Sequence, residues 1–600
     1  MLTGPGEGYT LWVTKYDTLN EASRSAIRSE CQRLKRRPLI SLVISPGGAS
    51  LDLLDGSLIS VREQLYSTWE VCLPVTAEFS SQLPGSPLEP ILNDSRVRKI
   101  EVPGSYDHLA ATNAALTEAA GDFAGFLLPG DRLSEDALYH IAAAISADCD
   151  ADILYTDEDS IDSSGLRQEP RFKSGWDRDL LLASNYVGQF IVFRPTLLQQ
   201  IGLLRESAGD ASYWDLLLRA AAALTDDCAR HLPLVSYHRR KEEASFLPAP
   251  SLERTVPDST IRILREHLEA CGEPKADFVQ AAPGTNYIRV MRPVPEPAPL
   301  VSVIIPTRDH VDLLQQCVEG VLSRTDYPRL ELLIVDNGSQ EAGALAFLGT
   351  IAEKDRRVRV LKQPGIFNYS AMNNAAAREA LGEVLLLLNN DTEVISPHWL
   401  GEMVSHVVRP EVGAAGAKLL YPDGRLQHGG VVLGPNGSVI HIQRLVSQFE
   451  GGYLNQLSVP RSLSAVTGAC MAIRHEVYDE AGGLDEINLP VAFNDIDLCL
   501  RLGDLGYRII WTPFAELIHH ESASRPEWRI GHELEQGIRE QQYFRAAWGK
   551  LVDTDDPFHN PNLLFGWNEV SIPVFPPRRA SRVGAWGGVE RAFRSAGDPR

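Results

Sequence analysis

Long hydrophobic runs are scarce in this 600-residue chain. The longest uninterrupted aliphatic run extends only from Val384 to Leu388, whereas a membrane-spanning helix needs about 20 apolar residues. The N-terminal segment MLTGPGEGYTLW also lacks a basic region followed by an apolar core, the pattern of a secretory signal. We therefore expect a cytoplasmic protein.

Positive charge and paired cysteines are scarce as well. The 57 Lys and Arg residues are outnumbered by 79 Asp and Glu residues, and the net charge is −22. Because nucleic-acid binding relies on clustered cations that displace counterions, we expect no nucleic-acid partner. The eight cysteines include no C-x-x-C pair, which favours reduced, buried thiols over a disulfide framework or a zinc site.

What is present is the composition of an ordinary globular protein, with 44% hydrophobic and 23% charged residues. The most informative segment reads as strand, loop, helix and strand. Val301 to Ile305 is apolar and β-branched, as in a parallel strand buried on both faces, and the strand Leu332 to Val335 ends at Asp336. Ligands of open α/β sheets bind at such carboxyl ends, so we expect a nucleotide site here.

Four motifs follow one another in an order that resembles one enzyme family. VSVIIPT (301–307) with IVDNGS (334–339) resembles the opening of inverting family 2 glycosyltransferases, which have the GT-A fold. GEVLLLLNNDTEV (382–394) resembles the strand that ends in their metal-binding acidic motif, and FNDIDLCLRLGDLGYRI (493–509) resembles the helix that carries their general base. LIHHESASR (517–525) resembles the closing segment of bacterial rhamnosyltransferase-like and O-antigen-type members.

The resemblance assigns a role to specific residues. It implies that Asp495 is the catalytic base, since a carboxylate near the anomeric carbon suits a displacement with inversion. It places Asp391 and His519 on a Mn²⁺ or Mg²⁺ ion, which would bridge the two phosphates and assist their departure. The residues that it places against the nucleotide sugar are Thr307, Asp309, Asp336, Asn374, Asn389 and Arg525.

Each assignment has a structural alternative. Asp336 would simply cap a strand end, Asp391 would belong to a turn, and His519 would be a satisfied structural histidine. Asp495 would be a plain helix N-cap. Because Asp495 and Asp497 lie two residues apart, only one of them can face a substrate, and we expect Asp497 to support the helix start or a neighbouring cation.

Two further details qualify the site. The family often has a second aspartate where Asn389 stands, so Asp391 would carry more of the metal binding, although an amide oxygen can also coordinate. His428, in LQHGGVVLG (426–434), is a candidate for the acceptor side.

The chain resembles itself at a long period, which predicts duplicated domains. Three N-terminal segments resemble three C-terminal segments in the same order. These pairs are 37–46 with 299–306, 121–138 with 382–400, and 213–221 with 494–502.

We therefore predict an α/β protein with two tandem GT-A domains, each with a Rossmann-like, mostly parallel sheet, joined by a helical linker. The second domain is the catalytic one. The predicted divisions are an N-terminal helical extension (1–36), a degenerate GT-A-like domain (37–245), a linker with a helix (246–299), the catalytic domain (300–552) and a C-terminal tail with a poorly ordered end (553–600).

The N-terminal half lacks most of the carboxylates that the resemblance requires. Its strand 71–76 has no acid at the place of Asp336, Tyr213 stands at the place of the base, and only Asp131 of the acidic motif remains. We expect a catalytically silent domain that binds acceptor or serves as a dimerising scaffold. Its acidic cluster, residues 155–162, would hold a cation or form a solvated turn.

The expected function is transfer of a sugar from a nucleotide-sugar donor, of the dTDP-rhamnose or UDP-hexose type, to a cell-surface polysaccharide or lipid-linked glycan. Members of the family commonly act at the inner face of the membrane, which leaves peripheral membrane association open. The alternative is a non-catalytic glycan-binding or scaffold subunit of a polysaccharide-assembly complex. A dehydrogenase is disfavoured because the strand at Val301 ends in PTRDH and not in a G-x-G-x-x-G turn. The oligomeric state stays open.

Overall fold

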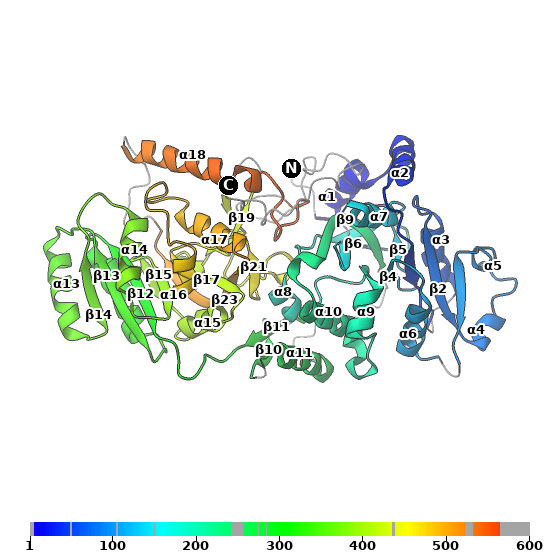
Figure 1. Ribbon diagram of the computed structural model, residues 1–600, viewed down its shortest axis with the longest axis horizontal. Coiled ribbons are helices and arrows are strands. Elements are labelled where there is room, and N and C mark those ends of the chain that lie inside the picture. The colour runs from blue at the N-terminus through cyan, green and yellow to red at the C-terminus, as the bar shows by residue number, and fades with distance from the viewer. Residues whose placement is uncertain are drawn as a thin grey trace.

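Two α/β domains lie side by side in the computed structural model, one from each half of the chain (Figure 1). The structure describes residues 5–47, 51–103, 106–147, 150–241, 256–273, 275–283, 285–434, 439–521 and 532–563. Within these ranges, no helix is both long enough and apolar enough to cross a bilayer.

The N-terminal domain is built on a mixed sheet of nine strands in the order β3-β2-β1-β4-β8-β6-β9-β5, with β7 paired to β6. Its strands are β1 (Ile40–Val43), β2 (Trp69–Val75), β3 (Val97–Glu101), β4 (Phe123–Phe126), β5 (Arg132–Leu133), β6 (Ile153–Ile161), β7 (Arg167–Arg171), β8 (Ile191–Phe193) and β9 (Ala229–Arg240). Its helices include α1 (Pro5–Trp12), α2 (Glu21–Arg33), α3 (Leu51–Arg62), α4 (Ala77–Ser81), α5 (Glu89–Leu92), α6 (His108–Glu118), α7 (Ala137–Ala147), α8 (Arg178–Ala183), α9 (Pro195–Ile201) and α10 (Ser212–Ala223).

The C-terminal domain has a sheet of ten strands in the order β14-β13-β12-β15-β22-β17-β23-β16, with β18 paired to β17 and β21 to β23. Its strands are β12 (Val301–Thr307), β13 (Leu330–Asp336), β14 (Val358–Lys362), β15 (Val384–Leu388), β16 (Thr392–Val394), β17 (Val412–Leu420), β18 (Leu426–His428), β21 (Arg461–Leu463), β22 (Cys470–Arg474) and β23 (Arg508–His519), and a separate hairpin joins β19 (Val431–Leu433) to β20 (Val439–His441). Its helices include α12 (Val311–Ser323), α13 (Ala342–Lys354), α14 (Tyr369–Glu379), α15 (Trp399–Val407), α16 (His475–Glu480), α17 (Asn494–Asp504) and α18 (His532–Val552).

The two sheets share one topology, which confirms the predicted tandem α/β duplication. In each, the first four strands along the order are parallel, and the fifth joins them antiparallel. Apolar side chains fill both faces of both sheets, in two clusters for each domain, and Val459 of the C-terminal half joins one of the N-terminal clusters. The sheets are therefore parallel over the half that carries the predicted nucleotide site and mixed beyond it.

The duplication extends to individual hydrogen bonds. In both domains a buried serine on the first strand donates to a glutamate of the second, at 2.6 Å, and accepts from a glycine N–H at 2.8 Å. A Cβ on either glycine would lie within 2.6 Å of that serine oxygen, so only glycine fits. The equivalent pairs are Ser41 with Ser302, Glu70 with Glu331, and Gly121 with Gly382.

The predicted linker packs against the N-terminal domain. Its helix, α11 (Asp258–Ala270), buries Ile263, Leu264 and Leu268 in that domain's core, and the hairpin β10 (Asp277–Gln280) and β11 (Ile288–Met291) follows. Residues 242–255 lie outside the described residues.

The start of the predicted C-terminal tail is a strap, residues 555–563, that runs across both domains. Asp556 accepts from Leu433 N at 2.7 Å in the C-terminal domain, and Asn560 donates to Asp157 at 2.8 Å in the N-terminal domain. Asn562 donates to the Pro233 carbonyl at 2.9 Å. These residues are packed structure, whereas the predicted disordered end lies outside the described residues.

The acidic cluster is mostly a buried strand. Asp157, Glu158 and Asp159 of β6 are fully buried, so the solvated-turn alternative is wrong for them. It holds only at the last residue, Asp162, which accepts from Ser164 N at 2.9 Å in an exposed turn. Each buried carboxylate is bound by side chains of the same chain, such as Lys173 Nζ at 3.0 Å from Glu158 and His238 Nδ1 at 2.6 Å from Asp159. No group of three or more His, Cys, Asp or Glu side chains suited to a metal occurs among the described residues.

Cysteine burial follows the prediction in part. Seven of the eight cysteines lie in the described ranges, and all seven are free thiols. Five are buried, whereas Cys228 is half-buried and Cys271 is exposed.

A buried ion cluster holds the two domains together. Asp179 of α8 lies 2.7 Å from Arg409 and 2.6 Å from Arg508, both from the C-terminal domain. Burial disfavours the charged carboxylate, but the two guanidinium groups hold the pKa of Asp179 well below its usual range. The acidic and basic side chains at the interface between the two domains are therefore ionised, and they neutralise one another.

We expect Asp179→Asn to lower the free energy of unfolding by about 3–5 kcal/mol, because it removes the fully buried carboxylate and leaves the two buried guanidinium groups with the half-exposed Glu411. Since the pKa of Asp179 is depressed on folding, this contribution is present above pH about 4 and is lost as the pH falls further. Urea denaturation of the full chain, followed by fluorescence, measures it. Asp423→Asn is the matched control, since the exposed Asp423–Arg425 pair should leave the midpoint unchanged. Equal shifts in both variants would contradict the assignment.

Candidate active site

The carboxyl ends of β12, β13 and β15 bring three predicted site segments to one edge of the sheet. Thr307 lies opposite Asp336 in the register of β12 and β13. The side chain of Asn390, which follows β15, donates to Thr307 Oγ1 at 3.0 Å. All three residues are buried or nearly so, and the parallel half of the sheet holds their backbones in place.

Asp336 is a half-satisfied carboxylate at this edge. Its Oδ1 accepts from the N–H of Ser339 at 2.8 Å and from its hydroxyl at 2.7 Å, across a turn in which Gly338 has φ 78°. Its Oδ2 makes no hydrogen bond with the described residues. That oxygen is available to a hydroxyl or N–H donor of a ligand.

Asp309 organises the neighbouring loop. Its carboxylate accepts from the backbone N–H groups of Gln340 at 2.6 Å and Glu341 at 2.9 Å, and these bonds lower its pKa. Its own N–H donates to Ser339 Oγ at 2.9 Å. Asp309 therefore holds the loop after β12 against the loop after β13, and its contribution to the pocket is to shape it.

Asp391 and His519 face each other at the next strand ends. Asp391 Oδ1 lies 3.1 Å from His519 Nε2, and Thr392 pairs with His519 in the register of β16 and β23. Burial raises the pKa of Asp391, but the contact with His519 outweighs it and the pKa is lowered. Oδ1 is nevertheless a buried acceptor without an aligned hydrogen bond among the described residues.

A glutamine that the sequence motifs do not identify orients this histidine. Gln427 Oε1 lies 2.9 Å from His519 Nδ1. Because a carboxamide oxygen can only accept, Nδ1 carries a proton. Nε2 is then the nitrogen that would present its lone pair to a cation bound beside Asp391. Asn389 Nδ2 lies 3.3 Å from the same Nε2. In the sequence, what could have indicated a site role for Gln427 is its position directly before His428 in the LQHGG segment.

This donor set fits a divalent cation. An anionic oxygen without an aligned hydrogen bond and an imidazole nitrogen that can act as a ligand converge, and the side-chain amide of Asn389 lies 3.3 Å from that nitrogen. With two strong ligands from the described residues, the remaining coordination positions would fall to phosphate oxygens and water.

Asp495 lies across the site from these ligands, as the second residue of α17. Its Oδ2 accepts from Gly468 N at 2.8 Å and its Oδ1 from Ile496 N at 2.9 Å. The residue is half-buried, and Phe493 occupies the N-cap, so the plain N-cap alternative is wrong.

Asp497 faces the interior, as its two-residue offset from Asp495 predicts. It pairs with Arg501 at 2.8 Å and accepts from Trp548 Nε1 at 2.8 Å. The prediction that it supports a neighbouring cation is confirmed.

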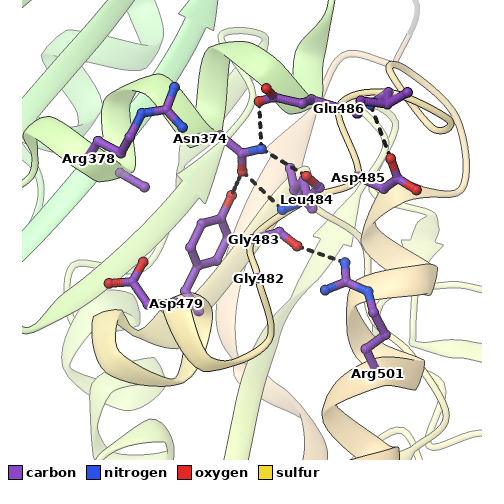
Figure 2. Close-up of a pocket in the computed structure, with 12 residues that line it drawn as sticks. Asn374, Arg378, Asp479, Gly482, Gly483, Leu484, Asp485, Glu486 and Arg501 are labelled. Atoms are coloured by element: carbon purple, nitrogen blue, oxygen red, sulfur yellow. Dashed lines mark hydrogen bonds between the residues drawn. The ribbon is translucent and has the colours of Figure 1, made fainter. Parts of the chain in front are cut away.

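Asn374 does not join the site. Its amide donates to Leu484 O at 2.8 Å and to Glu486 at 2.9 Å, and its oxygen accepts from the Tyr478 hydroxyl at 2.5 Å and from Leu484 N at 3.0 Å (Figure 2). These bonds use the full capacity of a carboxamide, so the predicted contact with a nucleotide sugar has no free donor or acceptor. Asn374 instead clasps the loop 484–486 beside a pocket of about 720 Å³.

Arg525 lies outside the described residues, together with the rest of 522–531. The structure therefore describes every other predicted site residue. It brings Thr307, Asp336, Asn389, Asp391, His519 and Asp495 to one edge of the domain and places Asp309 behind them.

The N-terminal domain keeps the frame of this site without its free groups. Val75 ends β2 where Asp336 ends β13. Asp215 pairs with Arg219 four residues later, as Asp497 does with Arg501, which places Tyr213 at the position of Asp495.

The N-terminal counterparts of Asp495 and Asp391, which are Tyr213 and Asp131, make contacts within their own domain. The ring of Tyr213 packs edge-on against Phe126 at 5.0 Å. The carboxylate of Asp131 accepts from the hydroxyl of Tyr237 and from Arg240 N. No free carboxylate oxygen corresponding to Asp391 Oδ1 occurs among the described residues of this domain.

Comparison with known proteins identifies related sequences. Residues 302–482 match the family described as Glycosyl transferase family 2. The chain is 40% identical over 94% of its length to the uncharacterized protein y4gI of Sinorhizobium fredii, of which it covers 62%. It is 39% identical over 92% of its length to the O-antigen biosynthesis protein RfbC of Myxococcus xanthus, of which it covers 42%. The chain thus spans less than two thirds of either relative.

More distant similarities cover parts of the chain. An N-acetylglucosaminyl-diphospho-decaprenol L-rhamnosyltransferase of Mycobacterium tuberculosis is 24% identical over 38% of this chain and 76% of that protein. Among solved structures, the mannosyltransferase PcManGT of Pyrobaculum calidifontis, in complex with GDP-Man and Mn²⁺, aligns with 44% of this chain and 66% of that one, at 19% identity and a TM-score of 0.32.

We expect Asn374→Ala to lower the free energy of unfolding by about 2–4 kcal/mol, because it leaves the buried Tyr478 hydroxyl and Leu484 N–H without their acceptor. Chemical denaturation measures the change. Asn488→Ala in the same loop removes a single exposed hydrogen bond and should cost less than about 1 kcal/mol. A negligible effect of Asn374→Ala would return this residue to the list of ligand contacts.

Proposed function

We propose that the C-terminal domain is an inverting glycosyltransferase, because residues 302–482 match the family described as Glycosyl transferase family 2. The observation that carries the proposal is the convergence of three carboxylates with distinct surroundings at one edge of the domain. Asp336 keeps one oxygen free, Asp391 adjoins an oriented histidine, and Asp495 is held by two backbone N–H groups.

Backbone hydrogen bonds connect the Asp391–His519 pair to Asp495, the proposed base. Asn389 N donates to Ala469 O at 3.0 Å, and the preceding Gly468 N donates to Asp495. A reacting sugar between Asp391 and Asp495 would therefore lie between groups fixed on one hydrogen-bonded backbone path.

Different side chains of the site would bind different parts of the donor. The free Oδ2 of Asp336 would accept from the nucleobase or a ribose hydroxyl, and Thr307 and Asp309 would shape the same pocket. Asp391, His519 and Asn389 would hold Mn²⁺ or Mg²⁺. When bound, that ion supplies a Lewis acid for the charge that develops on the departing diphosphate.

Asp495 would act as the general base. The acceptor hydroxyl gives its proton to the carboxylate as its oxygen forms the new bond to the anomeric carbon, and the bond from that carbon to the diphosphate breaks on the opposite face. The two N–H groups that bind Asp495 fix the direction of its carboxylate. Attack from the face opposite the leaving group inverts the configuration.

For the substrates, we propose a donor of the dTDP-rhamnose or UDP-hexose type and an acceptor that is a cell-surface polysaccharide or lipid-linked glycan. Support comes from the relatives named for O-antigen biosynthesis and for rhamnosyl transfer. Reaction would take place in the cytoplasm at the inner face of the membrane, with the N-terminal domain as a silent scaffold.

The first test is nucleotide release from a panel of dTDP-, UDP- and GDP-sugars with Mn²⁺ or Mg²⁺. Asp495→Asn should lower turnover by about 10²–10⁴-fold, because it removes the proton acceptor. Tyr213→Phe, at the equivalent position of the N-terminal domain, should keep wild-type turnover. Loss in both variants would contradict a single C-terminal active site. Binding of no donor by the wild type would favour the scaffold alternative.

The metal pair gives an independent test. Asp391→Asn and His519→Ala should abolish saturable Mn²⁺ binding in the presence of a nucleoside diphosphate, followed by electron paramagnetic resonance, and Gln427→Leu should weaken it about 10–100-fold by releasing the orientation of His519. His520→Ala is the matched control, because His520 is adjacent to His519 in the sequence but its Nε2 lies 3.8 Å from Glu393. Unchanged Mn²⁺ affinity in His519→Ala would exclude the proposed ligand set.

A further inference from the structure

Two histidines outside the proposed machinery form a bonded pair beside it. His428 Nδ1 lies 2.9 Å from His441 Nδ1, and the rings meet edge to face at 4.9 Å. His428, at the end of β18, is fully buried, whereas His441, at the end of β20, is half-buried. The pair thus connects a buried strand to the accessible side of the site.

The hydrogen bonds of His428 determine where both protons lie. The backbone N–H of Thr467 donates to His428 Nε2 at 3.4 Å, so this nitrogen carries a lone pair. A neutral His428 then holds its proton on Nδ1 and donates it to His441 Nδ1. The proton of His441 is consequently on Nε2, at the opposite edge of its ring.

Both imidazoles are neutral near pH 7. Burial lowers the pKa of His428 well below its ordinary value and lowers the pKa of His441 as well. A second proton would place two donors against each other across the 2.9 Å contact, which also disfavours protonation.

His441 is near the proposed base. The ionisable groups that act on it electrostatically are Asp495, Glu521 and His519. Consecutive backbone N–H groups connect the pair to the base, because Thr467 donates to His428 and Gly468 donates to Asp495. The Nε2 of His441 makes no hydrogen bond with the described residues and is not sealed from solvent. A neutral N–H donor is therefore held in the neighbourhood of the carboxylate that would deprotonate the acceptor.

One short strand orients both imidazoles. Gln427 fixes the tautomer of His519, and its neighbour His428 fixes that of His441. Two adjacent side chains of β18 thus orient two different imidazoles of the proposed site.

We propose that His441 is an acceptor-positioning residue: its Nε2–H donates to a hydroxyl of the acceptor sugar adjacent to the one that Asp495 deprotonates, and His428 sets the tautomer that makes this possible. The ligand class is a sugar with vicinal hydroxyl groups. This inference rests on the proposed glycosyltransferase function.

The tautomers can be measured without turnover. In full-length protein carrying ¹⁵N-labelled histidine, long-range ¹⁵N–¹H spectra should show His441 as the Nε2–H form and His428 as the Nδ1–H form. His428→Asn, which keeps a donor near the Nδ1 position, should preserve the His441 signal, and His428→Phe should lose it. A His441 signal of the Nδ1–H form in the wild type would overturn the inference.

Activity separates a positioning role from a merely structural one. With methyl glycosides as acceptor probes, His441→Phe should lower acceptor-dependent nucleotide release roughly tenfold through the acceptor KM, the size of one lost hydrogen bond. Donor hydrolysis without acceptor and the donor KM should stay unchanged, and His441→Gln, which retains a donor, should recover most of the rate.

The outcomes distinguish this inference from the proposed function. An unchanged acceptor KM in His441→Phe, or equal losses with and without acceptor, would overturn the role of His441 while Asp495→Asn still abolishes turnover. Full activity in Asp495→Asn would overturn the proposed function itself, and the inference with it.

Discussion

The proposed active site depends on one short segment, residues 461–468, that the N-terminal domain holds in place. Asp177 of that domain accepts from the N–H of Ser462 at 2.8 Å and from its hydroxyl at 3.1 Å. At its other end the same segment donates to His428 and, through Gly468 N, to Asp495. Since displacement of a reacting group by about 1 Å can cost a hundredfold in rate, a domain that fixes this segment would act on the proposed catalysis without touching the substrate.

The seam that transmits this constraint is ionic and buried, which makes it specific as well as stable. Asp179 of the N-terminal domain lies 2.7 Å from Arg409 and 2.6 Å from Arg508, and Glu411 lies 3.0 Å from each of the same two guanidinium groups. A buried ion pair contributes little net stability compared with apolar packing, but misplacing either partner is costly. The strap reinforces the same arrangement, because Asp556 holds β19 while Asn560 binds the other domain. The hairpin that carries His441 is thereby tied to both domains.

Sequence reasoning located the parts of the site that local pattern determines. Apolar strands that end in a polar residue placed Asp336 and Asp391 at a sheet edge, and helical spacing separated the roles of Asp495 and Asp497. It could not find Gln427, whose importance lies in a contact with His519 that is 92 residues away. It also misjudged Asn374 and the acidic cluster of β6, because composition does not reveal which partners burial will supply, such as Tyr478 for the former and Lys173 for the latter.

The two domains differ in how their equivalent side chains are bound. Asp391 Oδ1 is buried without an aligned hydrogen bond, a state that typically costs about 1–3 kcal/mol, and a ligand would relieve it. In the N-terminal copy, Asp131 is bound by Tyr237, and the histidine equivalent to His519, His238, is bound by Asp159. These N-terminal counterparts are therefore satisfied by the chain itself, whereas Asp391 in the C-terminal domain keeps an oxygen that a ligand can bind.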